Sequence, residues 1–454
     1  MNTPFLNRYN IQAADLCTFY PGMDVNRLFL VYAPLAGVSF ISDRENLSKL
    51  ETEIALEPQR RNGSFAKLID QITDTSESDV NSMIVSSPNK YTKLSILPNL
   101  ICNFSCSYCY SAKGRSKAEI TKERLRLALD FFIDNKRVTE RTLTIFISGG
   151  GEPVISWEKV RFIVLYSRKR AQEQGFNLDL LLMTNGSLIT PEMVHFLKEH
   201  QVQVGVSFEI LPEIQQTQRG KHEQVKSSIH TMLDMGLIPS ICSVITPHNV
   251  NRMEEMVSVV VSEYAGIKHL NFEPAMSNEL FADETVLDTF YHNFVEHFFR
   301  AKKLSGEHRI TLDCNVVRKV EKLFPRYCQG KLCLTPNGTF SICHTVSSPK
   351  EKAYDDFVYG RLTDEGPVFD EHKFQRLIDA EHILLPDCAA CIARWHCAGG
   401  CLMYRRNYDQ KKFRAVCRFT QKMTGTILLA KLDAAYQEMH HHGIDKLLSD
   451  YTKK

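Results

Sequence analysis

The 454-residue sequence contains no run of apolar residues that approaches the roughly 20 needed to cross a bilayer. Its first residues, MNTPFLNRYN, lack the basic stretch and the apolar stretch of a secretory signal peptide. The net charge is only +2, so no excess of positive charge indicates binding to nucleic acid or to an anionic membrane. These absences predict a cytoplasmic protein with neither nucleic acid nor a membrane as a partner.

Cysteine, in contrast, is abundant, with 14 residues. Thiols stay reduced in the cytoplasm, so these cysteines predict metal binding and not disulfides. Cys102, Cys106 and Cys109 lie within ICNFSCSYCYS (101–111), and no fourth cysteine lies on that stretch. A structural zinc site needs four ligands, and a disulfide framework needs an even number of cysteines. Three thiolates alone leave one metal position open, which is typical of catalytic sites.

Between residues 90 and 310 the sequence alternates between strand and helix patterns. The expected strands are 93–98, 143–148, 179–184, 202–208, 238–245 and 269–274, with helices such as 155–174 and 251–264 between them. Six such units predict an α/β fold, a partial (β/α)6 barrel, in which the active site lies at the C-terminal ends of the strands. The cysteine stretch follows the first strand and SGGGEP (148–153) follows the second, so both lie on the expected catalytic face.

Residues 1–85 are expected to form a separate small α+β unit. Its elements in order are strands at 27–33 and 37–42, helices at 45–56 and 64–72, and a polar linker at 73–82. The two β-rich runs are close enough in sequence to predict a hairpin, because only a Pro-containing turn separates them.

After the barrel, in residues 311–420, the strand and helix patterns weaken, and eight of the 14 cysteines lie between Cys328 and Cys417. A segment too irregular to build its own apolar core, but dense in thiols, is usually held together by metal. Residues 421–454 are expected to form a C-terminal helix, with its clearest helical pattern at 421–439.

The pattern Cys-x3-Cys-x2-Cys, with Tyr108 before the last cysteine and its place after the first barrel strand, resembles the radical SAM superfamily. The resemblance implies that Cys102, Cys106 and Cys109 hold a [4Fe–4S] cluster whose open iron binds S-adenosylmethionine (SAM). One electron from this cluster cleaves SAM into methionine and a 5′-deoxyadenosyl radical. The alternative is that the three residues are incidental buried thiols.

The same resemblance implies contacts to SAM elsewhere in the barrel. Gly149, Gly150, Gly151 and Glu152 match the family's Gly-Gly-Glu-Pro loop, which holds the amino group of SAM. Glycines let a backbone approach a ligand closely, and a glutamate accepts hydrogen bonds from an ammonium. Taken alone, a glycine-rich turn is more often only a turn.

Ser207 ends the fourth strand, and Arg219 follows it at the spacing of the residues that contact the SAM carboxylate and ribose in peptide-modifying relatives. Arginine is a natural partner for a carboxylate. The sequence departs from the family directly after this strand, where Glu209-Ile210 stands in place of the usual Asp-Gly. An ordinary loop role for Ser207 and Arg219 is the alternative.

The eight C-terminal cysteines resemble the SPASM extension of radical SAM enzymes, which carries two auxiliary [4Fe–4S] clusters. The resemblance implies one cluster on Cys328, Cys333, Cys343 and Cys401 and another on Cys388, Cys391, Cys397 and Cys417. Clusters with four thiolates have no open iron, so they favour electron transfer. Two alternatives stay open: Cys314 replaces Cys328, or the Cys-x2-Cys pair belongs to a zinc ribbon.

His344 follows Cys343, at the position of a catalytic aspartate in sulfatase-maturing relatives. Its imidazole, with an ordinary pKa of about 6.5, is a candidate base, and a hydrogen-bond donor beside the cluster is the alternative. Cys242 lies in a β-run, where a small buried hydrophobic residue is the simplest interpretation.

Together these features imply an oxidoreductase that installs a thioether or a carbon–carbon or carbon–oxygen crosslink in a ribosomally made precursor peptide. Its cofactors are SAM and three [4Fe–4S] clusters, and its electron donor is a flavodoxin or ferredoxin. The N-terminal unit resembles a winged-helix module that recognises the leader of such a peptide. The alternatives are an epimerase with Cys242 or Cys314 as thiol donor, a sulfatase-type protein maturase, and a non-enzymatic iron–sulfur or zinc-ribbon protein.

Overall fold

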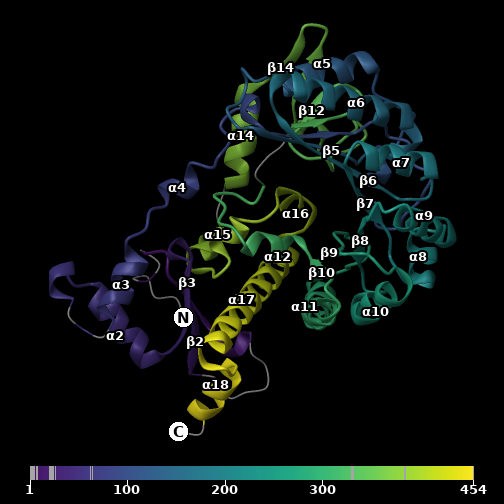
Figure 1. Cartoon of the computed structure of the whole chain (residues 1–454). Helices are drawn as coiled ribbons and strands as arrows, with labels where there is room; N and C mark the ends of the chain where they lie inside the picture. Colours follow the sequence, from purple (N-terminus) through teal and green to yellow (C-terminus); the bar gives the residue numbers. More distant parts are fainter. Residues whose placement is uncertain are drawn as a thin grey trace.

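The computed structural model describes residues 6, 9–19, 25, 27–61, 63, 65–328, 332–382 and 385–452. A small antiparallel sheet near the N-terminus and a large, mostly parallel sheet form two parts of the molecule. The long helix α17 (Gln410–His440) extends from the region of the large sheet toward the small one (Figure 1). No helix within the described ranges is long and apolar enough to cross a membrane.

Six parallel strands form the centre of the large sheet, and they confirm the six that the sequence predicts. They are β4 (Lys93–Ile96), β5 (Thr142–Ile147), β6 (Asn177–Thr184), β7 (Val202–Ser207), β8 (Ser240–Ile245) and β9 (His269–Pro274). The helices between or after them include α5 (Lys122–Phe132), α6 (Trp157–Gln174), α7 (Pro191–Glu199), α9 (His222–Asp234), α10 (Met253–Glu263) and α11 (Glu284–Glu307). Sequential strands are neighbours and the helices lie outside them (Figure 1), which is consistent with a partial barrel.

The large sheet continues past these six strands on both sides. Its further strands are β10 (Thr311–Asp313), β11 (Leu332–Leu334), β12 (Thr339–Ser341), β13 (Val358–Thr363) and β14 (Gly366–Phe369). The expectation of an irregular segment here was therefore wrong. Four of these strands have only three or four residues, too few to show periodicity in sequence. Strand β11 is held by parallel pairing with the distant β4, where Cys333 faces Ser95.

The N-terminal sheet has the order β1-β2-β3 and contains the expected hairpin, β2 (Leu28–Ala33) and β3 (Val38–Asp43). The sequence did not indicate β1 (Gln12–Asp15), which is only four residues long. Two expected helices are present as α2 (Arg44–Ile54) and α3 (Ala66–Thr73), although Ser64 lies outside the described residues. The expected linker contains a short helix, α4 (Ser78–Asn81).

This N-terminal sheet packs between two layers. Phe29, Val31 and Ala33 on one face of β2 join the apolar side chains of α2 and α3 in a small separate core. Leu30 and Tyr32 on the other face join the main core. The Tyr32 hydroxyl lies 2.8 Å from Nε2 of His396, so the unit docks directly against the cysteine-rich segment.

Helix α17 begins at Gln410, well before the predicted start at residue 421. The side chain of Asp409 caps it by accepting a hydrogen bond from the backbone N–H of Lys412 (2.9 Å). The cysteine spacing around Cys417 hid this helix from the sequence analysis. The helix ends at His441, which takes the left-handed conformation (φ 60°), and α18 (Ile444–Thr452) follows.

Candidate active site

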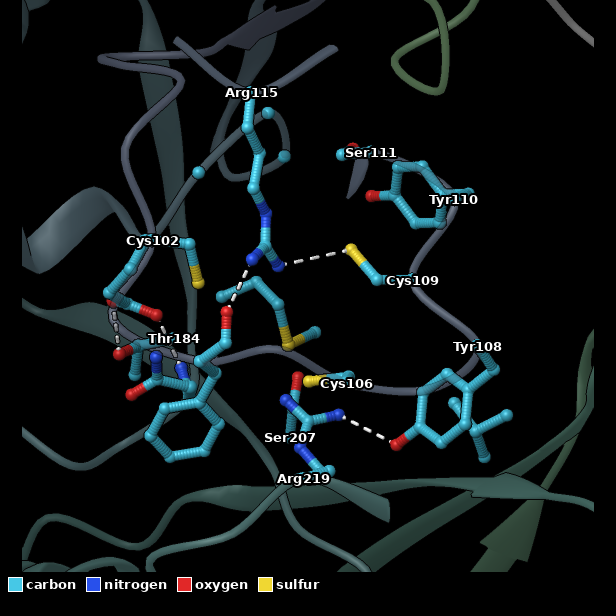
Figure 2. A pocket seen from close by; sticks show the side chains of 18 of the residues that line it. Cys102, Cys106, Tyr108, Cys109, Tyr110, Ser111, Arg115, Thr184, Ser207 and Arg219 are labelled. Atoms are coloured by element: carbon cyan, nitrogen blue, oxygen red, sulfur yellow. Dashed lines mark hydrogen bonds between the residues drawn. The ribbon is translucent and has the colours of Figure 1, made fainter. Parts of the chain in front are cut away.

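The cysteine stretch after β4 borders a cavity of about 330 Å³ at the C-terminal ends of the barrel strands (Figure 2). The expected site residues that line it are Cys102, Cys106, Cys109, Tyr108, Gly149, Gly150, Gly151, Glu152, Ser207 and Arg219. Arg115, Thr184, Asn185 and Glu273 also line it, and the sequence analysis assigned no role to them. The fold therefore brings the predicted residues of three separate βα loops to one place.

The cysteine stretch and the glycine-rich loop are joined backbone to backbone. The N–H of Gly151 donates to the carbonyl of Asn99 (3.0 Å), and the N–H of Glu152 donates to the carbonyl of Ile101 (2.6 Å). The buried Asn99 side chain adds a bond from Nδ2 to Oγ of Ser156 (2.7 Å). A Cβ on Gly151 would overlap the carbonyl of Ile101, so this approach requires glycine.

Glu152 is buried and held by three donors. Its carboxylate accepts from the Thr184 hydroxyl (2.6 Å) and from the backbone N–H groups of Val154 (3.1 Å) and Asn185 (2.7 Å). Burial raises the pKa of the carboxyl, and these donors oppose that rise. Glu152 is thus fixed at the cavity wall, where contact with the amino group of SAM stays a prediction.

Arg219, Tyr108 and Glu209 form a buried cluster that the sequence did not reveal. Nη1 of Arg219 donates to the Tyr108 hydroxyl (2.9 Å) and lies 3.5 Å from Oε1 of Glu209, to which the Tyr108 hydroxyl also donates. The Arg219 side chain is 9% exposed. Its Nε has no hydrogen-bond partner within the described parts of the chain. A guanidinium at a cavity wall is suited to bind a carboxylate.

Ile210 takes a backbone conformation that favours glycine, the residue that the family resemblance implies here. Its φ is 66°, in the left-handed region that β-branched residues rarely enter. The side chain is fully buried, so packing holds the strained conformation. The preceding residue, Glu209, reaches across to Tyr108 on the cysteine stretch and accepts from the N–H of Val244 (3.0 Å). The departure from Asp-Gly therefore links β7 to the cysteine stretch.

Four of the C-terminal cysteines border a second cavity, of about 200 Å³: Cys388, Cys391, Cys397 and Cys417. Of the other four, Cys343 and Cys328 lie near Cys401, and Cys343 and Cys333 lie near Tyr110. The charged neighbours of Cys314 are Glu273 and Arg318. Both four-ligand assignments stay predictions.

Burial disfavours the thiolate form of these cysteines. It raises the pKa of Cys417 to about 11 and that of Cys401 to about 12. A metal centre supplies the positive charge that such thiolates need. Among the described side chains, no three of His, Cys, Asp or Glu converge tightly enough for a single metal ion. An iron–sulfur cluster places its own iron and sulfide between its thiolates, so its ligands do not meet at one point.

His344 is not one of the residues that line the cavity. Its ring contacts Tyr110 edge-on, with 5.8 Å between the ring centroids. Glu273 of β9 is a further carboxylate at the cavity wall, and it accepts a hydrogen bond from Nη2 of Arg318 (2.7 Å). A role for His344 as base stays a prediction.

The buried Glu209 predicts a pH-dependent stability. Burial raises its pKa to about 7, against the attraction of the Arg219 guanidinium. Folding raises the pKa of this carboxyl, so the fold favours its protonated form. The resulting stabilisation is fully present below 4.5, the pKa in the unfolded chain, and is lost as pH rises through about 7. Between about pH 5 and about pH 8, the free energy of unfolding of the wild type should fall relative to that of Glu209→Gln, by on the order of 1–3 kcal/mol.

Denaturant unfolding of both proteins across this range measures the effect. The comparison is between the slopes of the free energy of unfolding against pH. Absolute values are not compared, because loss of the charge beside Arg219 shifts the whole curve of the variant. Parallel curves would show that Glu209 is ionised in the fold throughout.

The sequence profile of the Radical SAM superfamily matches residues 96–260. An uncharacterized protein of Methanocaldococcus jannaschii is 25% identical over 178 residues, which are 38% of this chain and 58% of that protein. The radical SAM cyclopropyl synthase TigE of Paramaledivibacter caminithermalis is 30% identical over 24% of this chain and 25% of its own length. The chain thus spans well under two thirds of these two proteins.

A serine-type anaerobic sulfatase-maturating enzyme of Klebsiella aerogenes is 22% identical over 66% of this chain and 76% of its own length. The solved structure of anSMEcpe with bound AdoMet is similar in fold, with a TM-score of 0.60, 17% identity and coverage of 74% of this chain and 98% of that one. The matched residues include the cysteine stretch, the glycine-rich loop and Arg219. Residues 96–260 are therefore a radical SAM domain, the catalytic domain of a superfamily whose members use SAM and a [4Fe–4S] cluster.

Proposed function

We propose that this chain cleaves SAM reductively and uses the resulting radical to install a thioether or a carbon–carbon or carbon–oxygen crosslink in a ribosomally made precursor peptide. The observation that carries the proposal is the cavity of the active site. Three thiols, a glycine-rich loop, a fixed carboxylate and a guanidinium all line it.

The residues present fit the cofactors of the superfamily. Cys102, Cys106 and Cys109 would hold a [4Fe–4S] cluster, which supplies the electron for SAM cleavage when it is bound. Glu152 would accept from the amino group of SAM, and Arg219, which lines the same cavity, would bind its carboxylate. Ser207 lies at the end of β7, in reach of the same cavity, and would contact the ribose.

The N-terminal unit supports a peptide as the substrate. Within the described residues, β3 pairs with β2 alone, so its other edge has no strand partner. Val38 and Phe40 of β3 are half-buried and pack against the small core, as Phe65 and Leu68 do, so side chains of an added strand would meet apolar side chains there. We therefore assign leader recognition to this edge.

The auxiliary cysteines support an oxidative outcome. Crosslinking removes two hydrogens from the peptide, one as an atom taken by the radical and the other as a proton and an electron. Two four-thiolate sites in residues 311–420 would accept that electron and pass it to a carrier such as a flavodoxin or ferredoxin. The cavity bordered by Cys388, Cys391, Cys397 and Cys417 supports one of these sites.

Epimerisation is a second candidate, and one observation favours it. Cys242 stands opposite Ser207 in the register of β7 and β8, so both side chains lie on the same side of the sheet. Burial raises its pKa to about 11, which keeps the thiol protonated as a hydrogen donor needs. Cys314, in contrast, is fully buried at the start of α12 (Asn315–Val320). Sulfatase-type protein maturation is a further alternative, with a protein in place of the peptide.

Replacing Cys106 by alanine should abolish SAM cleavage, because two thiolates do not hold the cluster that supplies the electron. Replacing Cys391 should reduce crosslinking but leave SAM cleavage largely intact, because that site lies outside the active-site cavity. The measurement is the yield of 5′-deoxyadenosine from anaerobically reconstituted protein with SAM and dithionite. The exposed Cys17→Ala variant is the matched control.

Undiminished cleavage by Cys106→Ala would refute the assignment of the three thiols. No cleavage by the wild type would instead support a non-enzymatic iron–sulfur or zinc-ribbon protein.

A precursor peptide encoded beside the gene should be modified much more slowly when its leader segment is removed, roughly 10-fold or more, because strand addition at β3 supplies part of the binding energy. The measurement compares turnover of full-length and leaderless peptide by mass. Supplying the leader as a separate peptide is the control for an effect of length alone. Equal turnover of both substrates would remove the recognition role of the N-terminal unit.

A further inference from the structure

Arg115 points into the loop that carries the three cysteines (Figure 2). It follows the short turn of Ala112–Gly114, six residues after Cys109. One guanidinium nitrogen, Nη2, lies 3.5 Å from Sγ of Cys109 and donates to it. The other, Nη1, donates to the carbonyl of Phe104, between the first two cysteines. Arg115 also lines the active-site cavity.

The Arg115 guanidinium therefore lies beside one of the three proposed cluster ligands, Cys109. It also contacts the backbone between the other two ligands, on the cavity side of the loop. A side chain that only supported the loop would not need a positive charge next to the thiols.

The segment after Cys343 holds this arginine in place. Nζ of Lys350 donates to the backbone carbonyl of Arg115 (3.0 Å). A Cβ on Gly114 would lie 2.7 Å from Oε1 of Glu351, whose carboxylate is fixed by the N–H groups of Ser347 and Ser348. The position of the guanidinium is thus set by the C-terminal segment as well as by its own loop.

We propose that Arg115 is a positioning residue that raises the reduction potential of the SAM-binding cluster, an inference that rests on the proposed function. Reduction adds one electron, and therefore one negative charge, to the cluster. A fixed cation and an N–H···S bond beside its thiolates stabilise the reduced form. Arg115 makes the cluster easier for a one-electron donor of the flavodoxin or ferredoxin class to reduce.

The test is a redox titration with dithionite, followed by electron paramagnetic resonance, on the reconstituted full chain. The SAM-binding cluster is identified as the reduced signal that changes when SAM is added, since auxiliary clusters with four thiolates have no iron open to SAM. In Arg115→Met, the ratio of reduced to oxidised cluster at a fixed potential should fall at least 10-fold. For one electron, that is a midpoint lowered by about 59 mV.

Lys113→Met is the matched control, because it removes one positive charge from the same turn at an exposed position. Its midpoint should equal that of the wild type. An equal midpoint in Arg115→Met with full iron content would overturn the proposal. So would an unchanged midpoint combined with weaker SAM binding, which would make Arg115 a SAM ligand.

If Arg115→Met fails to retain iron, the midpoints of Arg115→Lys and Arg115→Gln test the proposal instead. Both keep a hydrogen-bond donor, but only lysine keeps the charge. A midpoint near the wild-type value for lysine and a lower one for glutamine supports the proposal, and equal midpoints overturn it. A wild-type protein without any SAM-sensitive signal would refute the proposed function itself, which separates the two failures.

Discussion

The close backbone contact between the cysteine stretch and the glycine-rich loop is the constraint on which the rest of the site depends. Gly151 and Glu152 donate to the carbonyls of Asn99 and Ile101, and only glycine fits at the first of these positions. This contact joins the loops after β4 and β5 before any ligand arrives. It also fixes the backbone of Glu152. The Glu152 carboxylate then accepts hydrogen bonds from Thr184, the last residue of β6, and from Asn185, which follows it. Three βα loops are thus locked together around one cavity.

The charged side chains around this frame suit a ligand such as SAM, which carries an ammonium, a carboxylate and a sulfonium. Arg219 and its partner Glu209 lie at one wall, Glu152 at another, and Arg115 beside the thiols. Each charged group is fixed by hydrogen bonds to the protein, so little reorganisation is needed when a ligand enters. A hydrogen bond from Nζ of Lys350 to the carbonyl of Arg115 also connects the site to the C-terminal segment. The cysteine-rich region is therefore part of the active-site support and packs against the N-terminal sheet through Tyr32.

The six barrel strands and the cysteine, glycine and Glu152 positions could be predicted because their signals are local. A strand such as β6 contains a run of four apolar residues, 180–183, and the cysteine spacing lies within one loop. Strands β11 to β14 could not be predicted, because pairing with β4 holds β11 and the antiparallel ladder adds the other three. The roles of Glu209 and Arg115 were hidden for the same reason, since their partners become neighbours only in the folded chain.

The central claim is that three thiols leave one iron free for SAM. Electron–nuclear double resonance on the reduced protein tests it most directly, with SAM labelled by ¹⁵N at the amino group and by ¹⁷O at the carboxylate. The account predicts hyperfine coupling from both labels to the cluster electron spin. SAM that binds without coupling from either label would contradict it, because the open position would then not be where SAM is held.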